Sequence, residues 1–217
     1  MADTTSRTGS SYVTEEILRY LDDLHGPHDA GLDQAFHAPE RESIPAIQVG
    51  RSEGRFLEWL ARLHRVNLAV EVGTLAGYSA IRMARGMAAG SRLHSIEREP
   101  RHAAIARANV GAAGLSDRIE VHEGDGMEVL ERLSALGPFD LMFVDADKER
   151  YDLYGRWAAL HLRPGGLLIG DNVYYFGRLL DESPAALAMR RFHTEAKAHF
   201  DTCVVPTPDG MLLGIKR

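Results

Sequence analysis

The sequence contains almost no cysteine: Cys203 is the only one in 217 residues, so an intrachain disulfide is excluded. This thiol lies in a short apolar, β-like stretch beside Val204 and Val205. Free cysteines in such surroundings behave as small hydrophobic residues, and we therefore expect a buried structural thiol rather than a nucleophile. A chain that needs no disulfide framework fits a reducing compartment, so we predict a cytoplasmic protein.

Long apolar runs and an excess of positive charge are also missing. No stretch approaches the roughly 20 apolar residues that span a bilayer, and Met1 to Ser11 lack the apolar core of a signal peptide. Lys and Arg number 25 against 31 Asp and Glu, which gives a formal net charge of −6. Because a duplex-binding surface needs a basic stripe, we expect neither nucleic acid nor a membrane as a partner. Small molecules and carrier-bound groups remain open.

What the sequence does contain is a regular alternation of apolar strands and helical segments. This alternation predicts an α/β fold with a parallel sheet covered by helices on both faces. The last two strands are joined by too few residues for a crossover helix, so they should form an antiparallel hairpin. The predicted strands are Leu68–Val72, Arg92–Glu97, Ile119–Glu123, Phe139–Val144, Leu167–Ile169, Thr202–Val205 and Met211–Ile215. The helices predicted between them are Ser79–Met87, Pro100–Ala113, one through Val129 and Leu133, Glu149–His161 and Pro184–His199.

The part of the chain before the first strand is predicted to be mainly helical. Met1 to Ser10 are rich in Thr, Ser and Gly, and we expect a disordered tail there. Apolar residues at helical spacing then predict a helix that opens at Thr14 and stops at Gly26. Two more helices are predicted at Asp29–Phe36 and Glu53–His64, with a loop at Pro39–Pro45 between them.

A glycine-containing turn follows the first strand, within Glu71–Ser79. Gly73 lets the backbone turn sharply beneath a ligand, and Gly77 lets the chain approach closely where the next helix begins. The N-terminus of that helix offers free N–H groups to a carboxylate or a phosphate. Ser79 can both cap the helix and donate its hydroxyl. Any α/β domain has a glycine turn at this point, so a purely structural role stays open.

Acidic residues end the second and third strands. Glu97 is placed to accept hydrogen bonds from ribose hydroxyls, as acidic residues do in nucleotide-binding domains; the alternative is a solvated charge beside Arg98. Asp125 can accept a hydrogen bond from the exocyclic amine of adenine, or it can cap the helix before Met127. We expect both roles for Asp125, because a loop held by its own cap is a rigid place for a ligand contact.

Three oxygen-bearing side chains follow the fourth and fifth strands. Asp145 comes after one strand, and Asp171 and Asn172 come after the next. Open sheets place their ligands at such strand ends. Oxygen ligands without Cys or His suit a hard cation such as Mg²⁺, which keeps positions open for water or substrate. Asp and Asn are common in loops, but two sites on neighbouring strands, with Lys148 three residues past the first, favour a metal centre.

These motifs together resemble the metal-dependent catechol and caffeoyl-CoA O-methyltransferase family, which belongs to the class I S-adenosylmethionine enzymes. The resemblance covers the chain from about Ile47 to the C-terminus. It implies a Rossmann-like fold with a seven-stranded, mostly parallel sheet, one antiparallel strand and helices on both faces. The matching motifs are Glu71-x-Gly73-x-x-x-Gly77-Tyr78-Ser79, Glu97, Gly124-Asp125-Gly126, Phe143-Val144-Asp145-Ala146-Asp147-Lys148-x-x-Tyr151, Arg163-Pro164-Gly165-Gly166, Asp171-Asn172-Val173 and Asp209-Gly210.

The resemblance also implies roles for individual residues. It makes Asp145, Asp171 and Asn172 the ligands of Mg²⁺, or of another hard cation such as Mn²⁺ or Ca²⁺. It makes Lys148 the general base that accepts the proton of the substrate hydroxyl; the alternative is a salt bridge to Asp145 or Asp147. The positions that fall on cofactor contacts of the family are Val49, Glu71, Gly73, Thr74, Ser79, Glu97, Gly126 and Asp147.

Two segments depart from the family. Many relatives carry Leu-Trp after Val173, where this chain has Tyr174, Tyr175 and Phe176. This loop is expected to wall the acceptor pocket, where its rings either sandwich a planar phenol or pack within the protein. Residues 1–46 have no clear counterpart, and the corresponding family region covers the acceptor site and contributes to dimers. We therefore expect an N-terminal cap or dimer segment at 1–46, a methyltransferase domain at 47–217 and a homodimer.

The expected activity is methyl transfer to a hydroxyl of a small catechol or phenol. The alternative substrate is a hydroxyl on an acyl group carried by coenzyme A or an acyl carrier protein, which calls for a basic patch beside the pocket. Its candidate residues are Arg41, Arg51, Arg55 and Arg178. A nicotinamide oxidoreductase is disfavoured by the four-residue glycine spacing and the terminal hairpin. A non-catalytic binding module conflicts with a complete set of metal ligands accompanied by Lys148.

Overall fold

A seven-stranded sheet with strand order β3-β2-β1-β4-β5-β7-β6 forms the centre of the computed structural model, which describes residues 12–217. The expected disorder of Met1 to Ser10 lies outside these residues. β1 to β5 are parallel, and β7 runs antiparallel to both β5 and β6. This confirms the predicted fold with its single reversed strand. The strands are β1 Leu68–Val72, β2 Arg92–Glu97, β3 Ile119–Glu123, β4 Phe139–Val144, β5 Leu162–Gly170, β6 Phe200–Val205 and β7 Met211–Lys216.

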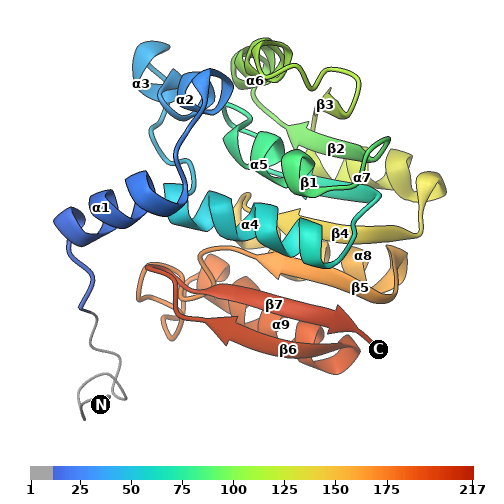
Figure 1. Ribbon diagram of the computed structural model, residues 1–217. Helices are drawn as coiled ribbons and strands as arrows, with labels where there is room; N and C mark the ends of the chain where they lie inside the picture. The colour runs from blue at the N-terminus through green and yellow to red at the C-terminus, as the bar shows by residue number, and fades with distance from the viewer. Residues whose placement is uncertain (1–11) are drawn as a thin grey trace.

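Helices cover both faces of this sheet (Figure 1). On one face α4, α5 and α6 pack over the strands, and on the other face α7, α8 and α9 do so. The α-helices are α1 Glu15–His25, α2 Ala30–Phe36, α3 Ala38–Arg41, α4 Arg51–Leu63, α5 Tyr78–Gly86, α6 Pro100–Ala112, α7 Gly126–Leu133, α8 Tyr151–His161 and α9 Pro184–His199, and 3₁₀ turns occur at η2 Ser134–Leu136 and η3 Lys148–Arg150.

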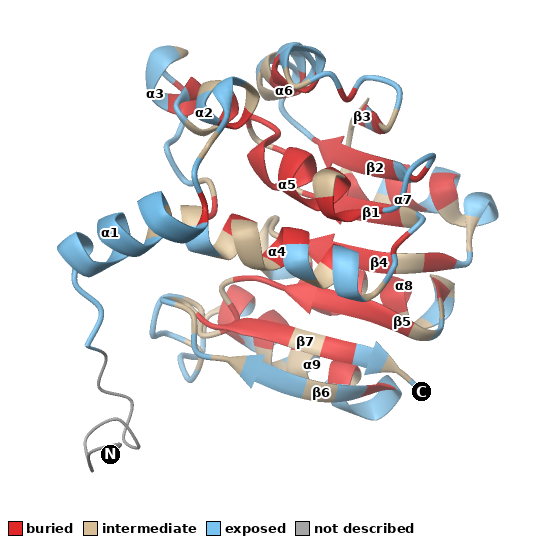
Figure 2. Ribbon diagram, in the orientation of Figure 1, coloured by how far each residue is buried: buried red, intermediate tan, exposed pale blue. Residues whose placement is uncertain are grey.

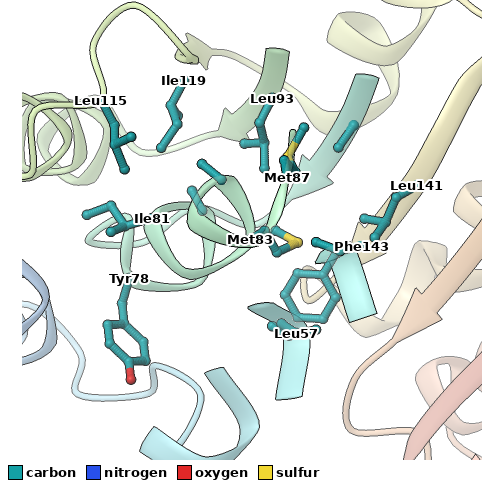
Figure 3. Packing of buried hydrophobic residues seen from close by; sticks show 14 of the residues in the cluster. Leu57, Tyr78, Ile81, Met83, Met87, Leu93, Leu115, Ile119, Leu141 and Phe143 are labelled. Carbon is teal, nitrogen blue, oxygen red and sulfur yellow. The ribbon is translucent and has the colours of Figure 1, made fainter. Parts of the chain in front are cut away.

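Each face of the sheet has its own hydrophobic core. On the α5 side, Ile81 and Met83 of α5 pack with Leu93 of β2 and Phe143 of β4, as Figure 3 shows. On the other side, Val144, Tyr151 and other buried side chains pack with α7, α8 and α9. The central strands are buried on both faces, which explains why they read as nearly continuous apolar runs in the sequence.

Two elements differ from the prediction in type or by more than two residues. α3 occupies part of the predicted loop Pro39–Pro45, because proline is tolerated in the first turn of a helix, where its missing N–H would have had no acceptor. β5 begins at Leu162 rather than Leu167. The pairing of β4 with β5 changes register between Phe139 and Leu141, so the intervening Pro-Gly-Gly segment, which resembles a turn, is accommodated as a bulge within the strand.

The expected burial of Cys203 is wrong, because its side chain is exposed. β6 is the last strand of the sheet, and Figure 2 shows it largely uncovered. Cys203 lines a shallow groove between the end of α4 and the strands β6 and β7, together with Leu63 and Leu213. The residue type predicted burial, but the position at an uncovered edge of the sheet decides its exposure.

The N-terminal helices differ in how closely they join the core. α2 buries Leu32 and Ala35 against the cluster that contains α5 and α6. α1 buries none of its residues, and its apolar side chains Leu21 and Leu24 are exposed. Within residues 12–217, no helix combines the length and the apolar character that crossing a membrane requires.

Candidate functional site

A cavity of about 470 Å³ opens at the carboxyl ends of the parallel strands. β2, β4 and β5 point in one direction and β7 in the opposite one, so the loops after the parallel strands gather at one edge (Figure 1). The cavity brings together most of the residues that the sequence singled out. Those on its wall are Val49, Gly73, Thr74, Ser79, Glu97, Gly126, Asp145, Asp147, Lys148, Asn172 and Phe176.

The turn after β1 is pressed against the loop after β4. Gly73 has φ +101°, and a Cβ atom at this position would overlap the carbonyl oxygen of Asp145. Only glycine fits there, for reasons of both conformation and space. Gly77 has φ +85° and is the N-cap residue of α5. The two glycines therefore hold the turn and the helix N-terminus at the floor of the cavity.

The expected capping role of Ser79 is wrong. The N-cap position belongs to Gly77, and no side chain caps α5. Ser79 is the second residue of α5, and its hydroxyl donates a hydrogen bond to Glu71 of β1. The hydroxyl is a donor, as expected, but its acceptor within the protein is Glu71.

Glu71 lies beneath the cavity rather than on its wall. Its side chain is fully buried and accepts hydrogen bonds from Ser79 and Ser95. Burial raises the pKa of Glu71 to about 8, although the two hydroxyl donors act in the opposite direction. Ser95 is bonded in turn to Thr74, which does line the cavity. Glu71 thus connects to the cavity through the hydroxyls of its neighbours.

Glu97 is buried at the end of β2, so the alternative of a solvated charge is wrong. Its carboxylate accepts hydrogen bonds from the backbone N–H groups of Leu75, at 2.8 Å, and Glu99, at 2.9 Å. The imidazole of His102 lies 3.8 Å from it. The carboxylate is therefore held firmly where the loops after β1 and β2 meet at the cavity.

Asp125 caps α7, as expected, by accepting hydrogen bonds from the N–H groups of Met127 and Glu128. Its other oxygen forms an ion pair of 2.7 Å with Arg150. Arg150 also pairs with Asp147 at 2.6 Å. The structure therefore links the loops after β3 and β4 through one arginine.

Asp147 has a further partner, because the Tyr154 hydroxyl donates a hydrogen bond of 2.7 Å to it. Arg150 and Tyr154 both line the cavity, and neither was predicted from the sequence as a site residue. The only available signal was their spacing of three and seven residues from Asp147, which places them on the same side of the following helix.

The side chains proposed for metal binding lie next to each other. Val144 pairs with Gly170 in the β4–β5 register, so Asp145 and Asp171 follow at adjacent strand ends. Asp171 is buried, and its pKa is raised by burial and by the negative charge of Asp145. Among the described residues it forms no salt bridge, and it accepts a 2.8 Å hydrogen bond from the Asn172 N–H.

This arrangement fits a divalent cation. Two neighbouring carboxylates, one of them buried, repel each other unless positive charge lies between them. The side chains of Asp145, Asp171 and Asn172 supply oxygen donors only, which is the ligand set that Mg²⁺, Mn²⁺ and Ca²⁺ prefer. Asp145 and Asn172 also line the cavity, so a cation held there would face a bound substrate.

Lys148 forms the salt bridge that the sequence left as its alternative role. Its ammonium donates hydrogen bonds to Asp145 Oδ1, at 2.9 Å, and to the Tyr151 hydroxyl, at 2.8 Å. It forms no bond to Asp147, which Arg150 occupies. Tyr151 is buried and donates to the carbonyl groups of Val144 and Asp171. Lys148 is thus held at the cavity by a carboxylate and a fixed phenol.

The three aromatic residues of the loop after β5 do not share one role. Tyr174 is half-buried and packs against the core, with its ring on Gly210, where a Cβ atom would lie 2.7 Å away. Tyr175 contacts the guanidinium of Arg178 at 5.5 Å. Phe176 alone of the three lines the cavity, and its N–H donates a 2.8 Å hydrogen bond to Asp209. A sandwich of all three rings around one ligand is therefore not formed.

The arginines proposed as a basic patch are each paired with an acidic side chain. The pairs are Arg41–Glu42, Arg51–Asp23, Arg55–Glu58 and Arg178–Asp181. None of these four arginines lines the cavity. They therefore do not form the patch expected for a phosphopantetheine or a carrier protein.

The fold and the cavity define a class I cofactor-binding α/β enzyme, and comparison with known proteins identifies the family. The profile of the O-methyltransferase family matches residues 28–217, and the chain belongs to that family. It is 38% identical over 218 residues to a catechol O-methyltransferase of Niastella koreensis, with 95% of this chain and 99% of the relative covered.

Solved structures agree with this assignment. An O-methyltransferase from Bacillus cereus in complex with SAH superposes with a TM-score of 0.89 at 32% identity, and the match covers 93% of this chain and 97% of the other. TomG from Streptomyces achromogenes, solved with SAM, gives a TM-score of 0.86 at 30% identity, covering 94% and 99%. The protein is an S-adenosylmethionine-dependent O-methyltransferase.

Proposed function

We propose that this enzyme transfers the methyl group of S-adenosylmethionine to a hydroxyl of a small catechol or related phenol, with the help of a hard divalent cation. The observation that carries the proposal is the placement of buried Asp171 beside Asp145, at the edge of a cavity that Lys148 also lines. The similarity to a catechol O-methyltransferase supports the substrate class.

The cofactor is proposed to occupy the part of the cavity between the turn after β1 and the loops after β2 and β3. There Gly73 and Thr74 would approach it through the backbone, and Glu97 would accept hydrogen bonds from its ribose. The remaining contacts are proposed for Val49, Ser79, Asp125, Gly126 and Asp147. Glu71 would act through Ser79, whose hydroxyl it orients.

The cation is proposed to bind Asp145, Asp171 and Asn172. When bound, the cofactor supplies an electrophilic methyl group, and the cation stabilises the acceptor oxygen as an oxyanion. The buried Asp171 is the strongest support, because burial of an ionised carboxylate costs free energy unless a positive charge accompanies it. Mg²⁺ is the expected ion, with Mn²⁺ and Ca²⁺ as other hard cations of suitable ligand preference.

Lys148 is proposed to accept the proton of the substrate hydroxyl at Nζ. Its contacts with Asp145 and Tyr151 fix the position of the amine at the cavity. A divalent cation nearby would repel the positive charge of the ammonium and so favour the neutral amine that can take up a proton. Phe176 is proposed to cover one side of the acceptor, because it is the loop residue that reaches the cavity.

We also propose a homodimer in which residues 1–46 take part. The support is the amphipathic helix α1, which exposes Ile17, Leu21 and Leu24 and buries none of its residues in the monomer. An apolar helix face without a partner in the monomer suits a second subunit or a cap over the acceptor. Light scattering on the full chain and on a Leu21→Glu variant tests this; a monomeric full chain contradicts it.

A methyl-transfer screen tests the substrate and the cation together. Catechols, monophenols and hydroxyacyl thioesters of coenzyme A are each incubated with S-adenosylmethionine, with Mg²⁺ or after EDTA treatment. We expect turnover of catechols that depends on Mg²⁺. Turnover of thioesters alone would overturn the substrate class in favour of the carrier-bound alternative. Full activity after EDTA treatment would overturn the role of the cation.

A further inference from the structure

A second group of metal-ligating side chains lies away from the cavity, on β2 and its neighbour β3. His94 is directly opposite Glu120 in the parallel register, and Ile96 is opposite His122. Side chains two residues apart on a strand share one face. His94, Glu120 and His122 therefore project from the same face of the sheet, the face on which Ile96 packs with α7.

The donor atoms of these three side chains form a compact triangle. His94 Nδ1 lies 3.0 Å from His122 Nε2 and 3.5 Å from Glu120 Oε2, and His122 Nε2 lies 3.8 Å from Glu120 Oε1. A tetrahedral ion with bonds of about 2.1 Å holds its ligand atoms roughly 3.4 Å apart. The two distances to Glu120 involve different carboxylate oxygens, and one ligand atom from each of the three residues lies within 4.8 Å of the others, so side-chain movements would bring them to the spacing of an ion.

The chemistry of the triangle differs from that of the site beside the cavity. Two imidazoles and one carboxylate form a donor set of nitrogen and oxygen. Such a set suits borderline transition-metal ions such as Zn²⁺ better than it suits Mg²⁺. His94 is buried and His122 is partly buried, whereas Glu120 is exposed at the rim of the group.

We propose that His94, Glu120 and His122 bind one Zn²⁺ or a similar transition-metal ion, with a water molecule as the fourth ligand. The ion links β3, the edge strand of the sheet, to β2. It stabilises the folded protein and takes no part in methyl transfer. The proposal does not depend on the proposed function, because none of its three ligands lines the catalytic cavity.

Binding is tested with Zn²⁺ and with Co²⁺, whose visible absorption reports coordination. The titrations use the Cys203→Ser variant, because the exposed Cys203 is another ligand for these ions, and a saturating concentration of Mg²⁺. We expect one equivalent of Zn²⁺ to bind, tetrahedral Co²⁺ absorption, and a higher melting temperature with Zn²⁺, since a ligand that binds only the folded state stabilises it. No binding, or binding without any rise in melting temperature, would overturn the proposal.

Matched variants locate the site. Loss of a residue that only hydrogen-bonds to a metal ligand costs about 10- to 100-fold in metal affinity. His122→Ala removes a proposed ligand itself, so it should weaken Zn²⁺ binding by about 100-fold or more. Glu120→Gln, at an exposed position, should weaken it in the same way without unfolding the protein. His199→Ala, a surface control, and Asp171→Asn, at the other site, should leave Zn²⁺ affinity unchanged. The assignment would be contradicted if His122→Ala and Glu120→Gln left the Zn²⁺ affinity intact, or if Asp171→Asn abolished it.

Discussion

Lys148 Nζ and Asp145 Oδ1 are 2.9 Å apart, so the proposed general base donates a hydrogen bond to the carboxylate of a proposed metal ligand. The ammonium supplies positive charge where a cation would also do so. A divalent ion at Asp145 would compete with Lys148 for this oxygen and weaken the ion pair that favours the protonated amine. Metal binding is therefore expected to weaken the contact between Lys148 and Asp145.

Replacement of Lys148 by alanine is expected to lower kcat by about 10²- to 10⁴-fold, the range typical of a lost general base. The cofactor affinity should change little, because the side chain contacts Asp145 and Tyr151 rather than the turn after β1. Steady-state kinetics and calorimetric titration with S-adenosylmethionine measure the two quantities. An unchanged kcat would reduce Lys148 to a structural ion pair.

The Asp145→Ala variant is expected to lose methyl transfer while it largely keeps its affinity for S-adenosylmethionine. Removal of this carboxylate takes away a proposed metal ligand and the ion-pair partner of Lys148. Activity is measured over a series of Mg²⁺ concentrations. Asp140→Ala serves as the control for loss of an Asp, because the Asp140 carboxylate lies near the start of β4 and accepts hydrogen bonds from Asn67 and Arg163. Wild-type activity in Asp145→Ala would refute the metal role.

The buried carboxyl of Glu71 predicts a pH dependence of stability. Its pKa is raised from 4.5 to about 8 in the folded state, so between these values the folded protein binds more protons than the unfolded chain. The contribution is fully present below pH 4.5 and is lost as the pH rises through about 8. The free energy of unfolding should therefore fall over this window by up to about 1.4 kcal/mol per pH unit.

The neutral Glu71→Gln variant should lack this dependence. Urea unfolding of both proteins at several pH values between 5 and 8, in metal-free buffer, gives the difference between their free energies of unfolding. We expect the wild type to lose stability relative to the variant as the pH rises. Parallel curves over the whole window would show that Glu71 is ionised in the folded protein.

Phe176 and Tyr174 are expected to respond differently to replacement by alanine. Phe176 is 64% exposed and lines the cavity, so Phe176→Ala should raise KM for the phenol severalfold with little change in melting temperature. Tyr174 packs on Gly210 and the core, so Tyr174→Ala should destabilise the protein by about 1–3 kcal/mol. Equal KM values for Phe176→Ala and wild type would remove Phe176 from the acceptor pocket.

The strands were readily predicted because most of them are buried on both faces and form apolar runs between turns; β1 and β4 match the prediction at both ends. The turn after β1 and the oxygen-bearing side chains after β4 and β5 could be placed from the sequence because each follows directly from its strand. The start of β5 was missed because Pro-Gly-Gly is typical of a turn, and only pairing with β4 keeps it in the strand.

Side-chain partners far apart in the sequence could not be predicted in this way. The pairing of Arg150 with Asp125 spans 25 residues and depends on how two loops meet. The exposure of Cys203 depends on where α4 ends relative to β6. His94 and His122 approach each other only because β2 and β3 pair in one register. Spacing along the chain carries no information about such contacts.

The close fit between Gly73 and the Asp145 backbone limits how the specificity of this enzyme can evolve. No side chain can enter between the two loops, so their separation is set by main-chain atoms alone. Mutation therefore cannot easily move the turn after β1 relative to the loop after β4. The range of acceptors is instead expected to change through residues such as Phe176, which is proposed to cover the acceptor and whose side chain is exposed.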